Sequence, residues 1–229
     1  MINSKEIKSI ACHFGADLCG IASIDIFDDS PAGFHQKDIY EQTRSVISVA
    51  CRVPDGSLNI KNPNPYSAIE SFALSKVHSI VLAMSLVIED KGFKAVIIPS
   101  VPYDYWDEEN LEGKGILSLK HLGYKAGLGY IGRNTLLCNE KYGNLIRLGA
   151  IVTNAALSPD KIPEGEMCPE TCNLCTTSCP VGAIDNYRVS QKICRPYSEV
   201  INKRGVEVCV CNVCRSVCPN RNGIKSLKE

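Results

Sequence analysis

The sequence predicts an α+β protein of two parts: a layered α/β domain over residues 1–163 and a smaller cysteine-rich domain over residues 164–229. Two observations support this prediction. Predicted helices and strands follow one another up to residue 153, whereas nine of the 13 cysteines lie at or after Cys168. The stretch between the two regions, residues 158–165, contains two prolines and is typical of a domain boundary.

The first predicted elements are a helix and two strands. Asn3 and Glu6 form a pattern typical of a capping box, and apolar residues at helical spacing follow, which predicts a helix over residues 4–14. Residues 18–22 are expected to form a short strand. Residues 46–53 are apolar, β-branched and end before a proline, which predicts a buried strand.

A long helix and two more strands complete the first domain. Ser67 begins a second capping box, and the wide apolar stripe that follows predicts a helix up to Gly92. Further strands are expected over residues 93–98 and 145–153. Gly149, inside the last strand, indicates that another group approaches the backbone closely there. Alternation of helices and strands in this way is typical of a layered α/β domain.

Composition and charge limit the classes of function. The chain has 25 Lys and Arg residues against 25 Asp and Glu residues, so no overall field attracts it to nucleic acid or anionic lipid. The N-terminus lacks the apolar region of a secretory signal, and the longest apolar run, residues 80–88, is too short to cross a bilayer. We therefore expect a cytoplasmic protein without membrane contact, in a reducing compartment.

The cysteines of the second domain form two runs that each end in Cys-Pro. They are Cys168, Cys172, Cys175 and Cys179, then Cys194 alone, and then Cys209, Cys211, Cys214 and Cys218. A [4Fe–4S] cluster needs one thiolate for each iron, and in two-cluster ferredoxins the cysteine before the proline binds the other cluster. The pattern therefore predicts two [4Fe–4S] clusters.

The ferredoxin pattern assigns eight of these cysteines. The predicted ligands of the first cluster are Cys168, Cys172, Cys175 and Cys218. Those of the second cluster are Cys179, Cys194, Cys211 and Cys214. This assignment leaves Cys209 spare. Three residues separate Cys168 from Cys172, one more than the usual spacing.

Two other cysteine chemistries fit this pattern less well. A disulfide framework is expected in small secreted chains, and this chain has no secretory signal. Paired zinc sites could use many of the same thiolates. Zinc motifs, however, do not usually end both halves in three residues followed by Cys-Pro.

Two segments of the first domain are candidates for a ligand site. Residues 103–112 interleave Tyr and Trp rings with carboxylates, which is typical either of an acidic surface loop or of a cleft for a flat molecule. Gly127, Gly129 and Gly132 spell G-x-G-x-x-G. A dinucleotide fingerprint follows a strand and opens a helix, whereas a predicted helix over residues 116–124 precedes this segment.

The glycine-rich segment 126–135, the strand at residues 149–153 and the two Cys-Pro runs occur in an order that resembles the epoxyqueuosine reductase family. That family shares its cobalamin-binding core with reductive dehalogenases. The resemblance covers most of the chain from about Gly113 onward. It implies a nitroreductase-like α/β domain that binds cobalamin, followed by a ferredoxin-like domain whose two clusters deliver electrons one at a time. Such an oxidoreductase would reduce a small-molecule or nucleoside substrate, with an external electron donor such as flavodoxin or ferredoxin.

The resemblance also implies site residues. Cobalamin would contact Gly127, Gly129, Tyr130, Ile131, Gly132, Asn134 and Thr135. About a dozen residues before this segment, family members carry an aspartate that donates a proton, and this chain has Gly113 there. The neighbouring Glu112 is therefore the candidate catalytic acid, with the carboxylates of residues 107–109 as alternatives.

The substrate class has two further constraints. The sequence ends at Glu229 without the helical-repeat extension with which longer relatives hold tRNA, and no basic stripe is evident, so tRNA is not the expected substrate. Two other functions fit the same motifs. One is an electron-transfer protein without a cofactor in its first domain, although a ferredoxin needs only the last third of this chain. The other is a corrinoid-handling protein that reduces cobalamin for another enzyme, which the missing aspartate favours.

Overall fold

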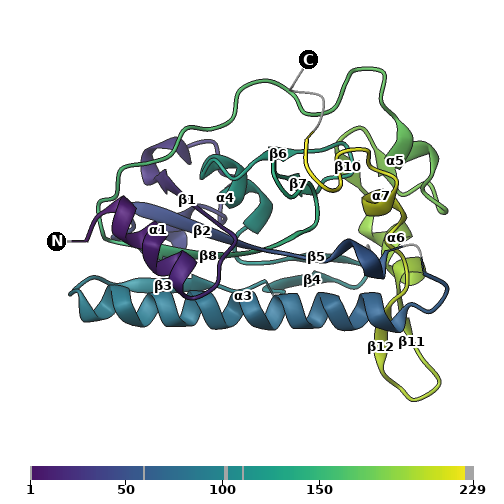
Figure 1. The fold of residues 1–229 in the computed structure, drawn as a ribbon, viewed down its shortest axis with the longest axis horizontal. Helices are drawn as coiled ribbons and strands as arrows, with labels where there is room; N and C mark the ends of the chain where they lie inside the picture. Colours follow the sequence, from purple (N-terminus) through teal and green to yellow (C-terminus); the bar gives the residue numbers. More distant parts are fainter. Residues whose placement is uncertain (1, 59, 101–102, 110, 225–229) are drawn as a thin grey trace.

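The computed structural model describes residues 2–58, 60–100, 103–109 and 111–224. Its centre is a four-stranded antiparallel sheet in the order β1-β2-β8-β3 (Figure 1). The strands are β1 (Leu18–Ser23), β2 (Ser45–Arg52), β8 (Ile146–Thr153) and β3 (Ala95–Ile98). All four are among the predicted strands. β8, which comes last along the chain, lies between β2 and β3.

Helices cover both faces of this sheet. α1 (Ser4–His13) and α3 (Asn64–Asp90) pack on one face, and α4 (Leu119–Lys125) packs on the other (Figure 1). Successive strand residues point to opposite faces. Ile47 and Ile151 therefore lie in the core under α3, whereas Val46 and Val152 pack with Leu122 of α4.

The helix α3 begins one turn earlier than the capping box at Ser67 predicts. It begins at Asn64, with Pro65 in its first turn, where a missing N–H breaks no intrahelical hydrogen bond. By length and apolar composition α3 could cross a membrane, but its buried residues pack on the sheet. Gly149 of β8 allows this contact, because a Cβ atom there would lie 2.4 Å from Cγ1 of Val77. The predicted close approach at Gly149 is thus confirmed.

The other elements of this region are short. They are the 3₁₀ helices η1 (Ile24–Ile26) and η2 (Asp55–Ser57), the helix α2 (Gln36–Ile39), and the strands β4 (Tyr105–Asp107), β5 (Glu112–Lys114), β6 (Tyr130–Ile131) and β7 (Leu137–Cys138). β4 pairs with β5, so much of the aromatic and acidic stretch forms a hairpin. The glycine-rich segment continues into the hairpin of β6 and β7 and opens no helix, unlike a dinucleotide fingerprint.

Residues 156–163, all of which the structure describes, contain no helix or strand and run along β1. The carboxylate of Asp160 accepts a hydrogen bond from the backbone N–H of Ile21 at 2.9 Å. The backbone N–H of Asp160 donates to the carbonyl oxygen of Ile21 at 2.8 Å. The segment thereby covers the edge strand of the sheet. The domain boundary at residue 163 stays a prediction.

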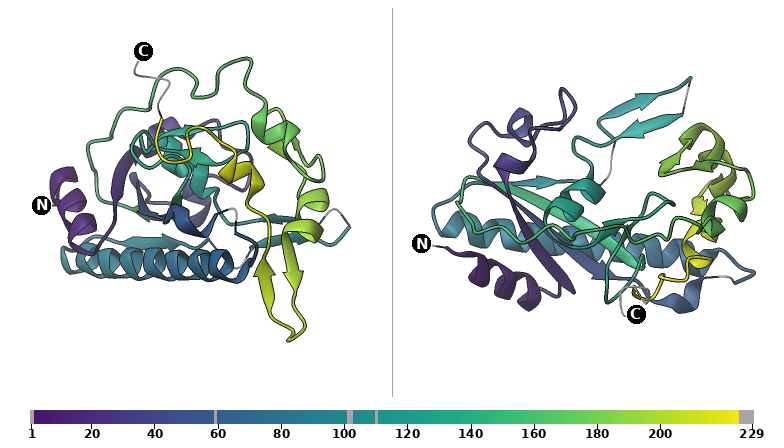
Figure 2. Two further views of the ribbon diagram at one scale, coloured as in Figure 1. Left: turned by 45° about the vertical axis from the view of Figure 1, so that its right-hand side comes forward. Right: turned by 90° about the horizontal axis from the view of Figure 1, so that it is seen from above.

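The cysteine-rich segment follows, and its elements are short. They are α5 (Leu174–Thr177), β9 (Ile184–Asp185), β10 (Arg188–Val189), α6 (Gln191–Ser198), β11 (Glu199–Ile201), β12 (Glu207–Cys209) and α7 (Val213–Ser216). α5 and α7 pack against each other. The segment lies at one end of the sheet, where the hairpin of β11 and β12 passes the start of α3 (Figure 2). The backbone N–H of Cys209 donates to Oγ of Ser67 there, at 3.2 Å.

Candidate functional site

The four cysteines predicted to bind the first cluster lie around one recess, and we call them the first quartet. The quartet consists of Cys168, Cys172, Cys175 and Cys218. Burial raises the pKa of the Cys218 thiol, and the other three thiols raise it further. Mutual effects of this kind are expected of ionisable groups that share one site. The fold thus brings Cys218 back to the three cysteines that lie before and within α5.

The four cysteines predicted to bind the second cluster form a second quartet, made of Cys179, Cys194, Cys211 and Cys214. Burial raises the pKa of Cys211, and Cys194 and Cys179 raise it further. Burial also raises the pKa of Cys214 to about 11, while Arg215 lowers it. Cys194, Cys211 and Cys214 line a large cavity. The quartets are those that the spacing predicts; that each holds a cluster stays a prediction.

The spacing of the thiols bears on the kind of metal. Within the part of the chain that the structure describes, no group of three or more His, Cys, Asp or Glu side chains is close enough to hold one metal ion. A zinc site with four thiolates requires such a group, because each sulfur lies about 2.3 Å from the same ion. In a cluster each thiolate binds a different iron. The choice between clusters and paired zinc ions stays a prediction.

The glycine-rich segment packs against the first quartet. The backbone N–H of Arg133 donates to Sγ of Cys168 at 3.4 Å. A Cβ atom on Gly132 would lie 2.8 Å from Cε of Met167, so Gly132 packs closely against the residue before Cys168. Asn134 donates from Nδ2 to the carbonyl oxygen of Cys214 at 2.9 Å. Hydrogen bonds to cluster sulfurs are among the factors that set a reduction potential.

Few of the residues expected to contact cobalamin face a cavity. Thr135 lines a recess of about 200 Å³ that adjoins the large cavity. Asn134 lines the recess of the first quartet. Gly127 and Gly129 have positive φ, and each lies close to a backbone carbonyl group. Tyr130, in β6, pairs with Cys138 of β7. The structure places most of this segment beside the first quartet, and its contact with cobalamin stays a prediction.

The large cavity has a volume of about 870 Å³, within the range of cofactor and small-molecule sites. Four parts of the chain form its wall: the first turns of α3, the start of the β4–β5 segment, α4 with β8, and the cysteine-rich segment. Its polar lining includes Tyr66, Ser67, Glu70, Tyr103, Lys120, Arg147, Arg195 and Arg215. Cys209, the spare cysteine, lines it too, and burial raises the pKa of its thiol.

One corner of this cavity is positively charged. Lys120, Arg147 and Arg215 come from three different elements and line both the cavity and the adjoining recess. Burial lowers the pKa of Lys120, and burial with nearby Arg215 lowers the pKa of Arg147 to about 10. Glu70 pairs with Arg147. Both arginines stay charged at neutral pH, so this corner suits an anionic group.

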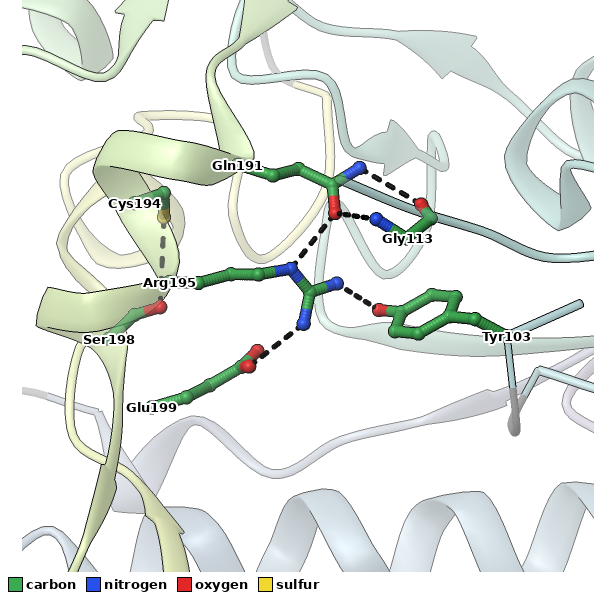
Figure 3. A network of polar contacts seen from close by, with 7 residues as sticks. All are labelled: Tyr103, Gly113, Gln191, Cys194, Arg195, Ser198 and Glu199. Carbon is green, nitrogen blue, oxygen red and sulfur yellow. Dashed lines mark hydrogen bonds and ion pairs between the residues drawn. The ribbon is translucent and has the colours of Figure 1, made fainter. Parts of the chain in front are cut away.

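Arg195 connects the cavity wall to the second quartet, because it follows Cys194 on α6 (Figure 3). Its guanidinium donates to Glu199 at 3.0 Å and to the hydroxyl oxygen of Tyr103. The same group lies 4.7 Å from the ring centroid of Tyr103 and 5.1 Å from that of Trp106. The aromatic stretch thus supports both interpretations made from the sequence, with Tyr103 lining the cavity and Trp106 partly exposed.

Gln191 holds the neighbouring strand β5. Its Oε1 accepts hydrogen bonds from the backbone N–H of Gly113 and from Nε of Arg195, at 3.0 and 2.9 Å. Its Nε2 donates to the carbonyl oxygen of Gly113 at 3.0 Å (Figure 3). Gly113 lines both the large cavity and a second cavity of about 580 Å³ that contains Phe34 and His121. β5 is therefore a wall shared by two cavities.

The candidate acid Glu112 lies on β5 opposite Asp107. Its side chain is not among the groups that line either cavity, although Gly113 beside it lines both.

The sequence interpretation missed Tyr103 as a polar group of the cavity. The hydroxyl oxygen of Tyr103 accepts from Arg195, which leaves its own hydrogen able to donate. The alternation of aromatic and acidic residues indicated a cleft, but it suggested the carboxylates, not Tyr103, as the proton donor.

No family model matches the chain. Among curated proteins, an epoxyqueuosine reductase of Leadbetterella byssophila is 26% identical over 246 residues, which cover 94% of this chain and 79% of that protein. An epoxyqueuosine reductase of Listeria monocytogenes is 33% identical over 122 residues, which cover 48% of this chain and 31% of that protein.

Solved structures give the same neighbours. An epoxyqueuosine reductase with an epoxyqueuosine-modified tRNA-Tyr stem loop has a TM-score of 0.65 at 18% identity, over 96% of this chain and 65% of that one. A reductive dehalogenase described as B12-dependent has a TM-score of 0.70 at 18% identity, over 94% of this chain and 31% of that one. The chain thus spans less than two thirds of either neighbour.

The chain therefore has the mixed helix and sheet fold shared by epoxyqueuosine reductases and reductive dehalogenases. Curated epoxyqueuosine reductases also match nearly its whole length in sequence. Its resemblance to the epoxyqueuosine reductase family is confirmed.

Proposed function

We propose that this protein is an iron–sulfur oxidoreductase of the epoxyqueuosine reductase type. Its two cysteine quartets would hold two [4Fe–4S] clusters in a ferredoxin-like domain. A cobalamin would bind in the large cavity of a nitroreductase-like domain. The observation that carries the proposal is that three cysteines of the second quartet line the same cavity of about 870 Å³.

The residues present fit these groups. The first quartet lies away from the large cavity, and the second quartet lies at its wall, so the two form a path for single electrons toward the cavity. Cobalamin, when reduced, supplies a strong nucleophile and reductant, and the protein supplies binding, orientation and protons. The cavity and its adjoining recess offer apolar walls with one positive corner, where Lys120 and Arg147 would hold an anionic part of the bound molecule.

The chain's own residues would position and protonate the substrate. Gln191 fixes Gly113 from both of its backbone polar groups, so the wall beside the substrate is rigid. Tyr103 holds a hydroxyl hydrogen at the cavity, and Arg195 would stabilise the oxygen when that hydrogen leaves. Glu112 remains the alternative acid if β5 shifts on binding.

The substrate we propose is a small molecule or a nucleoside. One relative is known with a modified tRNA stem loop, and this chain spans 65% of that protein. The net charge of zero argues against a long nucleic-acid contact. The reaction also needs an external one-electron donor, such as a flavodoxin or a ferredoxin, and we propose that the protein works in the cytoplasm.

A corrinoid-handling role is the second candidate. Gly113 occupies the place where the family's proton-donating aspartate is expected, and its backbone is held by Gln191. A protein that binds and reduces cobalamin for another enzyme has no need of a proton donor.

The test is an EPR spectrum of cob(II)alamin added to anaerobically reconstituted protein. We expect a protein-bound signal that lacks the nitrogen splitting of the lower axial ligand, together with two clusters in the iron analysis. An unchanged spectrum of the free cofactor would rule out cobalamin and leave an electron-transfer protein. Turnover of a substrate by the cobalamin-loaded protein would then separate the enzyme from the corrinoid handler.

A further inference from the structure

Arg215 is a buried cation without a carboxylate partner in an ion pair among the described residues. Only 4% of its surface is exposed. Its guanidinium donates to the carbonyl oxygen of Asn144, and Nδ2 of Asn144 donates to the carbonyl oxygen of Arg215 at 3.2 Å. This reciprocal pair of hydrogen bonds fixes the arginine to the segment just before β8. A buried cation in such a position is costly unless an anion lies nearby.

The second quartet is a source of negative charge beside Arg215. Arg215 follows Cys214 in α7 and lines the large cavity together with Cys211 and Cys214. Because Arg215 is buried, solvent screens its interaction with the adjacent, half-buried Cys214 less than it would at the surface. Four thiolates around a cluster would supply the negative charge that Arg215 has no carboxylate to provide.

The first quartet has a cation of a different kind. Arg133 is only partly buried, its guanidinium donates to the carbonyl oxygen of Glu170 at 2.9 Å, and it lies 5.6 Å from the ring centroid of Tyr187. Solvent reaches this arginine, so its charge is screened more strongly than that of Arg215. The two quartets therefore differ in the positive charge that they experience.

We propose that Arg215 raises the reduction potential of the cluster held by the second quartet, so that this cluster is the higher-potential one of the two. This inference rests on the proposed function, because it needs both clusters. A cluster gains one unit of negative charge on reduction, and a fixed buried cation stabilises the reduced form more than the oxidised form. Arg215 thereby gives the electron path a direction toward the cavity.

The electrons balance along this path. An external one-electron donor is oxidised as the first cluster is reduced. The first cluster is oxidised again when its electron passes to the second cluster, which is reduced beside the cavity. No bond is made or broken in either step, and Arg215 keeps its proton throughout because its guanidinium stays charged.

The test is a redox titration of the reconstituted full chain with dithionite, followed by EPR. The Arg215→Gln variant keeps a donor for Asn144 and removes the charge. We expect at least a tenfold lower ratio of reduced to oxidised second cluster at a given potential, which is about 59 mV for a one-electron couple. The first cluster should not shift. Arg215→Lys, which keeps the charge, should titrate close to the wild type.

Arg133→Gln is the matched control at the other quartet, and we expect it to change the second cluster by less than Arg215→Gln does. An Arg215→Gln variant that assembles both clusters with unchanged potentials would overturn the inference. If that variant does not assemble its clusters, the two cluster potentials of the wild type test the inference instead. The signal that disappears in Cys194→Ala identifies the second cluster, and the inference fails if that cluster has the lower potential. A wild type without two clusters would instead refute the proposed function.

Discussion

The sheet region and the cysteine-rich segment are held together in different ways. The sheet region has an apolar core in which Ile7, Ile47, Met84 and Ile151 are fully buried. Among the described residues of the cysteine-rich segment no helix is longer than α6, and the two quartets contribute eight polarisable thiols. Apolar burial stabilises the first region. If the quartets hold clusters, as we propose, the free energy of metal binding also stabilises the second region.

Iron removal should show this difference most strongly. We expect Cys175→Ala to lose about half of roughly eight irons per chain, and the cysteine-rich segment to exchange its amide hydrogens rapidly. The sheet should keep its protection. Hydrogen exchange with mass spectrometry measures both regions at once, and Cys12→Ala on the exposed side of α1 is the control. Equal loss of protection in the sheet would mean that the two regions fold as one unit.

The reverse perturbation is a change in the sheet core. Gly149→Ala places a Cβ atom 2.4 Å from Cγ1 of Val77, so α3 must move away from the sheet. We expect a loss of roughly 1–3 kcal/mol in the free energy of unfolding with unchanged iron content. Denaturant titration and iron analysis measure the two quantities. Gly56→Ala, which meets no atom within 4 Å, should leave both unchanged.

High pH should also affect the sheet region. Burial raises the pKa of Cys19 on β1 to about 12, while the unfolded thiol has its ordinary pKa of 9.0. The folded protein then holds this proton more tightly, so the stabilisation is complete below pH 9 and is lost as the pH rises toward 12. We expect the melting temperature to fall over this range, and to fall less in Cys19→Ala. Identical pH profiles for the two proteins would contradict the burial of this thiol.

The elements and residues that could be predicted from the sequence have local causes. Spacing before Cys-Pro placed Cys168, Cys172, Cys175 and Cys218 in one group, and these four line one recess of the structure. The strands were visible as apolar, β-branched runs. The hydrogen bond from Arg195 to Tyr103 could not be predicted, because the two residues are far apart in the chain. The burial of Arg215 likewise depends on contacts with Asn144, just before β8, that no local pattern contains.

A change at Gln191 should have a smaller effect, because its side chain supports only the strand β5 and no apolar core packs on it. Gln191→Ala removes the two hydrogen bonds to Gly113 and the acceptor of Nε of Arg195. We expect faster hydrogen exchange at Gly113, by about fivefold, for a net loss of about 1 kcal/mol. Global stability and iron content should not change. Gln42→Ala is the control, since Gln42 is exposed and accepts only from Tyr40. Unchanged exchange at Gly113 would show that β5 is held by other contacts.

The smallest effect is expected at Cys209, the spare cysteine. Its thiol is 3.8 Å from the carbonyl oxygen of Cys211, and its backbone N–H, not its side chain, donates to Oγ of Ser67. Cys209→Ser keeps that backbone contact, so iron content and both EPR signals should match the wild type. Cys211→Ser, two residues away, should lose the second cluster. If Cys209→Ser lost a cluster instead, the second quartet would have to be redrawn with Cys209 in place of one of its members.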